Sequence, residues 1–211
     1  MCKKKLFLII IPIILFILLS LFIRENALAG FESWIYEESI EHMNAFLTFC
    51  LTVITHIGGG IGVVVICIII FANKLFREKI GIQIGTGLIL SLLTNQVLKY
   101  VFARERPNIL RLVSATNYSF PSGHAMVNMT LYALLVIYCY KFIENKKLKS
   151  ILIPVMMGLT VIIGFTRIYL GVHYAGDIIG GWLLGFTISV IVYSFFNKNK
   201  PARKMIEDRI E

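Results

Sequence analysis

Residues 166–177 read TRIYLGVHYAGD, a polar stretch that joins two long apolar runs near the carboxyl end of a 211-residue chain. These runs, at about 151–168 and 178–196, are as long as the roughly 17–25 helical residues that cross a hydrocarbon layer of ~30 Å. Similar apolar blocks occupy about 6–23, 57–73, 80–100 and 125–141. The sequence therefore predicts an all-α, polytopic membrane helical bundle with six transmembrane helices.

The composition agrees with a membrane protein. Hydrophobic residues make up 57% of the chain and charged residues 16%, and the mean hydropathy is +0.79. An ordinary globular domain is about half apolar and about a quarter charged. No repeat, linker or shift in composition divides the chain, so we expect residues 1–211 to form one domain.

The segment 33–56 is harder to interpret, because it is acidic and amphipathic at first, then apolar, and it runs into Gly58, Gly59 and Gly60. We interpret it as a helix that lies on or dips into the outer surface, with the glycines as its break. The alternative is a seventh span, which would invert the sidedness of everything downstream.

The basic residues favour the six-span arrangement. Of the 21 lysines and arginines, 15 fall on one side of it. They are Lys3, Lys4, Lys5, Lys74, Arg77, Lys79, Lys141, Lys146, Lys147, Lys149, Lys198, Lys200, Arg203, Lys204 and Arg209. Because cytoplasmic loops are enriched in lysine and arginine, both termini are predicted to be cytoplasmic. Topology then explains the net charge of +9, and no nucleic-acid partner is needed to explain it.

Two features of the amino-terminal half have alternative interpretations. The basic start, the apolar run and Ala27-Leu28-Ala29 resemble a cleavable signal peptide, but an 18-residue run exceeds the usual h-region of about 7–15 residues. We therefore expect a retained span. The four cysteines lack paired spacing, so neither a disulfide framework nor a zinc site is predicted.

Ionisable residues gather at the predicted outer ends of the spans, although such groups are costly at membrane depth. Lys99 and Arg106 are seven residues apart, so in a helix they would share a face. Pro107 disfavours helix at Arg106, whose side chain would then leave from a helix terminus. Arg167 ends the fifth span and adds a guanidinium fork suited to phosphate. A snorkelling basic rim is the alternative for Lys99 and Arg106.

Ser122 and Gly123 are suited to a helix start, where free backbone N–H groups form an anion site beside His124. His173 and Asp177 are four residues apart, so the carboxylate can orient one imidazole nitrogen and leave the other free to react. The alternatives are a helix cap with an incidental histidine, or a metal site formed by His124, His173 and Asp177. Three nearby cations would repel a metal ion, so we predict no metal and no cofactor.

The three segments together resemble the signature of the type 2 phosphatidic acid phosphatase superfamily, which includes bacterial acid phosphatases and vanadium haloperoxidases. The matching patterns are Lys99-x6-Arg106-Pro107, then Pro121-Ser122-Gly123-His124, then Arg167-x5-His173-x3-Asp177. The family usually has serine where this chain has Thr166, which keeps a hydroxyl.

The resemblance implies a role for each matched residue. His173 would attack phosphorus and form a phosphohistidine, Asp177 would hold His173, and His124 would protonate the leaving oxygen and then activate water. The remaining five residues would bind the phosphoryl oxygens: Lys99, Arg106, Ser122, Gly123 and Arg167.

A pocket at the outer face, level with the headgroups, favours a membrane lipid phosphate as substrate. The resemblance is greatest to the phosphatidylglycerophosphatase B type, with undecaprenyl-pyrophosphate phosphatase second. A transporter, a non-catalytic lipid-phosphate binder and a vanadium haloperoxidase are the other classes. The ionisable residues stop at one rim instead of forming a path, which disfavours a transporter.

Overall fold

A computed structural model describes residues 3–108 and 110–197. Every regular element in these ranges is helical. The elements are α1 (Lys3–Arg24), α2 (Ala29–Glu41), α3 (Ala45–Ile57), α4 (Gly60–Ala72), the short α5 (Lys74–Phe76), the π-helical turn η1 (Arg77–Gly81), α6 (Ile82–Phe102), α7 (Gly123–Phe142), α8 (Lys146–Tyr169) and α9 (Ala175–Phe196). The predicted all-α membrane fold is confirmed.

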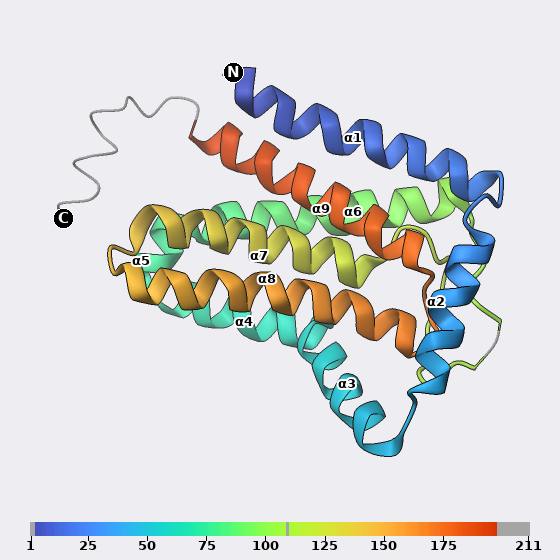
Figure 1. The fold of residues 1–211 in the computed structure, drawn as a ribbon. Coiled ribbons are helices and arrows are strands. Elements are labelled where there is room, and N and C mark those ends of the chain that lie inside the picture. Colours follow the sequence, from blue (N-terminus) through green and yellow to red (C-terminus); the bar gives the residue numbers. More distant parts are fainter. Residues whose placement is uncertain (1–2, 109, 198–211) are drawn as a thin grey trace.

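Helix α7 is central to the bundle and packs against α6, α8 and α9, while α1 lies along the outside of α9 (Figure 1). Glycines on α9 permit its close contact with α7. A Cβ atom placed on Gly185 would lie 2.4 Å from the carbonyl oxygen of Met126, and one on Gly181 would lie 2.7 Å from that of Ser122. Small residues allow helix backbones to approach closely inside a bilayer, so α9 is held directly against the first turns of α7.

The number of spans remains a prediction. Four described helices, α1, α7, α8 and α9, are long and apolar enough to cross a membrane, and the bent pair α3 and α4 would make a fifth. Helix α6 has 21 residues but does not meet the same test, because its sequence includes Thr94, Asn95, Gln96 and Lys99. The predicted count of six therefore depends on α6 crossing beside α7.

The prediction of one helix over 33–56 is wrong. The segment forms two helices, because residues 42–44 interrupt it and the Asn44 side chain caps α3 by accepting from the backbone N–H of Leu47 at 2.9 Å. The predicted glycine break is confirmed: α3 and α4 meet at Gly58 and Gly59 with a bend of 48°. The span predicted at 57–73 is thus only the second half of a bent pair.

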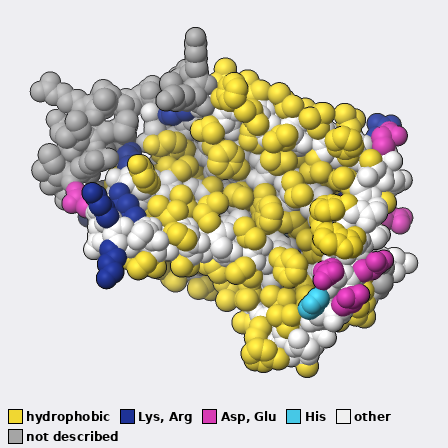
Figure 2. Space-filling model, viewed as in Figure 1, with side chains coloured by type: hydrophobic (Ala, Val, Ile, Leu, Met, Phe, Trp, Pro, Cys, Tyr) yellow, Lys and Arg dark blue, Asp and Glu magenta, His cyan; other side chains and the backbone are white. Residues whose placement is uncertain are grey.

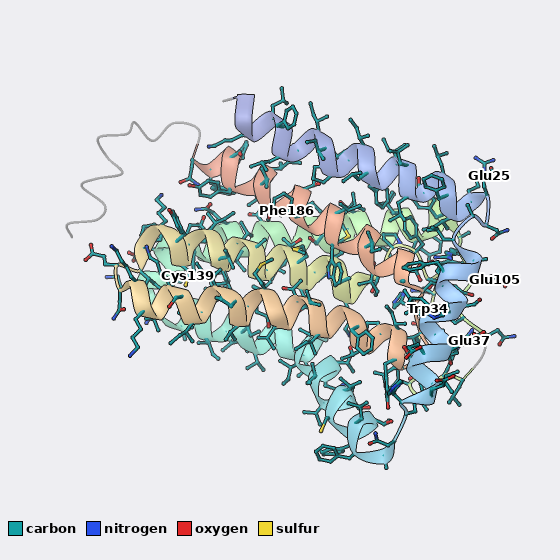
Figure 3. The ribbon with its side chains drawn as sticks, in the orientation of Figure 1. Glu25, Trp34, Glu37, Glu105, Cys139 and Phe186 are labelled. Carbon is teal, nitrogen blue, oxygen red and sulfur yellow. The ribbon has the colours of Figure 1, made fainter. Side chains whose placement is uncertain are left out.

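The charged groups separate to opposite ends of the bundle, with an apolar belt between them (Figure 2). Glu25, Glu37 and Glu105 lie at the end where α2 crosses the bundle, and Cys139 lies towards the opposite end (Figure 3). Cys50, Cys67 and Cys139 are free thiols, and Cys2 lies outside the described residues. The five basic residues predicted to mark the cytoplasmic tail, Lys198 to Arg209, also lie outside them.

Candidate active site

The predicted site residues come from the ends of α6, α7, α8 and α9 and from the loop 103–122, at the end of the bundle that α2 covers (Figure 1). The loop is fixed to its surroundings by backbone and tyrosine contacts. The Leu112 N–H donates to the Leu170 carbonyl at 3.1 Å, and the Tyr36 hydroxyl donates to the Leu110 carbonyl at 2.7 Å. The loop is thus held against both α2 and the turn between α8 and α9.

His173 and Asp177 are in contact, as their spacing predicted. The Nδ1 atom of His173 lies 3.3 Å from Oδ2 of Asp177, and both side chains are almost completely buried. However, α9 begins at Ala175, so His173 precedes the helix instead of opening it. The contact therefore forms across the helix start, where Asp177 also accepts from the Tyr174 N–H at 2.8 Å.

Ser119 contacts both members of this pair, and the sequence analysis did not predict it. Its hydroxyl donates to Oδ2 of Asp177 at 2.5 Å and lies 3.2 Å from Nδ1 of His173. Ser119 is fully buried, and its own N–H donates to the Arg104 carbonyl at 2.7 Å. Ser119 thus fixes both members of the pair relative to the loop.

Arg104 lies on the far side of the Asp177 carboxylate. Its Nη1 donates to Oδ1 of Asp177 at 2.7 Å, while Nη2 donates to Oε2 of Glu32 at 2.6 Å. Glu32 is buried on α2, so this ion pair joins the loop to that helix.

The three predicted phosphate-binding cations all lie near the pair. Arg106 Nη1 lies 3.2 Å from Nε2 of His173. Arg167 donates through Nη1 to the Thr55 hydroxyl at 2.8 Å, while its buried Nε has no partner among residues 3–108 and 110–197. Lys99 is buried near the end of α6 and donates to the Tyr118 carbonyl. A buried donor without an acceptor is unfavourable, and a phosphoryl oxygen would supply one to Arg167.

One detail of the cation prediction is wrong. Lys99 and Arg106 do not share a helical face, because α6 ends at Phe102 and Ala103 adopts a left-handed conformation with φ of 44°. Arg106 lies four residues beyond the helix, in agreement with the effect expected of Pro107. Its guanidinium is held by the carbonyls of Thr116, Asn117 and Val172 at 2.6–2.9 Å.

The start of α7 agrees with the prediction. Ser122 is the N-cap, and its hydroxyl accepts from the Ala125 N–H at 3.5 Å. Gly123 is the first helical residue, and His124 stands in the first turn. A Cβ atom placed on Gly59 would lie 3.5 Å from Nε2 of His124, so the bend between α3 and α4 lies against this imidazole.

Two buried asparagines support these elements and were also missed. Asn95 donates to the Pro121 carbonyl at 3.0 Å. Asn128 donates to the carbonyls of Gly58 and His124 at 2.6 and 2.8 Å. Polar residues inside apolar spans are costly unless they are paired, and that rule was the signal that could have found both. The described residues contain no group of three or more His, Cys, Asp or Glu side chains that could hold a metal ion.

The electrostatic environment suits a neutral His173. Burial lowers the pKa of His173, Asp177 opposes this effect, and the charges of Arg106 and Arg167 add to it. Burial also lowers the pKa of Arg106. For Arg104, burial would lower the pKa, but the carboxylates of Asp177 and Glu32 outweigh it, so the pKa is raised and the guanidinium stays charged.

Comparison with known proteins identifies relatives of this chain. The model of the PAP2 superfamily matches residues 80–201. Phosphatidylglycerophosphatase B of Bacillus subtilis is 31% identical over 90% of this chain and 95% of its own length. An undecaprenyl-diphosphatase of Sulfolobus acidocaldarius is 32% identical over 54% of each chain.

A solved structure extends this similarity to the fold. The crystal structure of a transmembrane PAP2-type phosphatidylglycerolphosphate phosphatase from Bacillus subtilis matches 91% of this chain and 97% of that one, with a TM-score of 0.83 and 29% identity. The fold and the comparisons define a multi-pass membrane lipid phosphatase. The chain belongs to the PAP2 superfamily.

Proposed function

We propose that this chain removes the terminal phosphate of phosphatidylglycerol phosphate at the outer face of the cell membrane, through a phosphohistidine on His173. The observation that carries the proposal is the contact of His173 Nδ1 with Asp177, which turns Nε2 towards the Arg106 guanidinium, 3.2 Å away, as the nitrogen that would attack phosphorus. Phosphoryl transfer depends mainly on positioning and on stabilising charge, and this site supplies both.

In the first step, Nε2 of His173 attacks phosphorus, while the Nδ1–H group keeps its proton and donates a hydrogen bond to Asp177. The bond from phosphorus to the lipid oxygen breaks, and His124, as an imidazolium, protonates that oxygen. In the second step, the neutral His124 takes a proton from water, the hydroxide attacks phosphorus, and inorganic phosphate leaves Nε2. Lys99, Arg106, Arg167 and the α7 start at Ser122 and Gly123 stabilise the phosphoryl oxygens.

The similarity to phosphatidylglycerophosphatase B supports this choice of substrate, because it extends over nearly the whole of both chains in sequence and in fold. Undecaprenyl pyrophosphate is the second candidate. The undecaprenyl-diphosphatase BcrC of Bacillus subtilis is 27% identical over 77% of this chain, and the residues proposed to bind phosphate contact only the phosphoryl group common to both lipids.

The charge distribution supports a site that faces outward and termini that are cytoplasmic. The site lies at the end of the bundle that α2 crosses, near Glu25, Glu37 and Glu105 (Figure 3). The first turn of α8, at the opposite end, contains the basic residues Lys146, Lys147 and Lys149. Cytoplasmic loops favour lysine and arginine, so the end with α2 is assigned to the outside.

The test is phosphate release by purified protein from phosphatidylglycerol phosphate, phosphatidic acid and undecaprenyl pyrophosphate in the same detergent. We expect the highest kcat/KM for phosphatidylglycerol phosphate. A marked preference for undecaprenyl pyrophosphate would replace the proposed substrate with the second candidate. Lipid binding or flux without phosphate release would contradict the proposed reaction.

A further inference from the structure

We propose that Glu32 and Arg104 are positioning residues that hold Asp177 in place for His173 and thereby connect α2 to the catalytic pair. The proposal rests on the proposed function, since it assigns these residues to the same reaction. Glu32 lies outside the three matched segments, and Arg104 occupies one of the unspecified positions between Lys99 and Arg106. Both contribute to one network of short contacts that ends on the Asp177 carboxylate.

The three side chains of the network contact one another and are mostly buried. The Glu32 side chain is 3% exposed and the Asp177 side chain is fully buried, with the Arg104 guanidinium between them. Arg104 Nη1 lies 2.7 Å from Oδ1 of Asp177 and 3.2 Å from Oε1 of Glu32. A planar guanidinium that contacts two carboxylates fixes the orientation of both.

The two oxygens of Asp177 have different partners. Oδ2 accepts from Ser119 and Tyr174 and contacts His173, whereas Oδ1 accepts from Arg104. Rotation of the carboxylate would move Oδ2 away from Nδ1 of His173. The Arg104 contact at Oδ1 opposes that rotation, so it acts on His173 through Asp177.

Glu32 keeps Arg104 in position from α2. Its Oε1 also accepts from the Gly176 N–H at 3.2 Å, and Arg104 lies over the Tyr174 ring, 4.2 Å from its centroid. The buried face of α2 consists of Glu32, Tyr36 and Ser39, while Phe31 and Trp34 are exposed on the other face. Helix α2, which covers this end of the bundle, therefore contributes one carboxylate to the interior of the site.

The first test measures kcat and KM for Arg104→Gln with the lipid substrate and with a soluble aryl phosphate. For histidines that bind metals, loss of the partner that orients the ring typically lowers activity by about 10- to 100-fold, and we expect a fall of similar size in kcat here, with a smaller change in KM. Unchanged kcat in a folded variant would overturn the proposal.

A second readout separates positioning from a merely structural role. The groups that act on His173 are Asp177, Arg106 and Arg167, together with His124 on α7. Without the Arg104 charge, the Asp177 carboxylate favours protonated His173 more strongly, so the acid limb of the pH–rate profile should move to higher pH. The substrate titrates identically with each enzyme, so the shift reports the protein. Lower kcat with an unmoved limb would indicate only lost structure.

Conservative variants separate the effect of the Arg104 charge from the effect of its contacts with both carboxylates. Arg104→Lys keeps the charge but cannot contact both carboxylates, so its acid limb should stay near the wild-type position while kcat is intermediate. Glu32→Gln, which preserves shape, should lower kcat several-fold. The double variant Glu32→Gln and Arg104→Gln should be no slower than Arg104→Gln alone, whereas additive losses would contradict a path through Arg104.

Glu37→Gln is the matched control, because Glu37 is exposed on the same helix (Figure 3), and its activity should equal that of wild type. If wild type turned over the aryl phosphate but no lipid, the proposed substrate would fail. The positioning proposal would still be tested by the same variants on the aryl phosphate.

Discussion

Replacing Asp177 with asparagine should slow the enzyme by about 100- to 1000-fold while leaving it folded. All four groups around this carboxylate can donate a hydrogen bond to it. They are the Arg104 guanidinium, the Ser119 hydroxyl, the Tyr174 N–H and Nδ1 of His173. An asparagine amide must therefore point its NH₂ group at one of them. The least costly arrangement keeps the amide oxygen at the Oδ2 position and turns the NH₂ group towards Arg104.

The magnitude follows from the lost charge. Two unit charges 3.3 Å apart, the separation of His173 Nδ1 and Asp177 Oδ2, interact by about 5 kcal/mol at an effective dielectric constant of ~20. The imidazole becomes positive as it bonds to phosphorus, so this attraction lowers the barrier. Rearrangement of Arg104 offsets part of it. If roughly 3–4 kcal/mol is lost, the rate falls by about two to three powers of ten.

The assay is phosphate release under saturating lipid, with thermal unfolding followed in the same detergent. Glu37→Gln makes the same chemical change at an exposed position of α2 and should behave as wild type. A folded Asp177→Asn enzyme within fivefold of the wild-type kcat would refute the argument that Asp177 supports a charged His173.

Three further predictions concern the surroundings of the pair. Ser119→Ala should lower kcat by about 10- to 150-fold, because a hydrogen bond to a charged group contributes about 1.5–3 kcal/mol; full activity would show that Asp177 alone orients His173. Gly171 has φ of 70°, and a Cβ there would lie 1.9 Å from the Leu110 carbonyl, so Gly171→Ala should cost at least ~2 kcal/mol and lower Tm by about 4–8 °C. Gly158→Ala, with no atom within 4 Å of its Cβ, is the control and should not lower Tm. Because burial lowers the pKa of His173, it is neutral, and therefore reactive, at pH values above that lowered pKa. As the pH is lowered, wild-type kcat should consequently persist past the ordinary histidine pKa of ~6.5 and decline only at lower pH; a decline centred near pH 7 would contradict a buried, neutral nucleophile.

Short-range patterns in the sequence predicted much of the site. The i, i+4 spacing of His173 and Asp177 and the capping preference of Ser122 are local rules, and both contacts are present. The pairing of Arg104 with Glu32 joins residues 72 positions apart, and nothing in the composition of either segment specifies it. The predicted helix over 33–56 failed for a related reason: hydropathy alone did not reveal that Asn44 caps a new helix.

The orientation of the chain in the membrane and the number of its spans depend on tertiary contacts as well as on local sequence patterns. The polar residues of α6, which include Asn95 and Lys99, reduce its hydropathy, yet these side chains pair inside the bundle with Pro121 and Tyr118. A helix whose polar groups are satisfied by other parts of the protein is tolerated at membrane depth. A hydropathy scale counts these polar groups as unpaired, so it underestimates the tendency of such a helix to span a membrane when tertiary contacts satisfy them.

The most direct test of the central claim is to trap the phosphorylated enzyme and locate the phosphate. His124→Ala enzyme should be mixed with an aryl phosphate, whose leaving group needs little protonation, and quenched under conditions that preserve phosphohistidine. The first step should then proceed while the second is slow, so mass spectrometry should find phosphate on the peptide containing His173 and none in the His124→Ala, His173→Ala double variant. Phosphate on another residue, or turnover without any phosphorylated enzyme, would contradict the account.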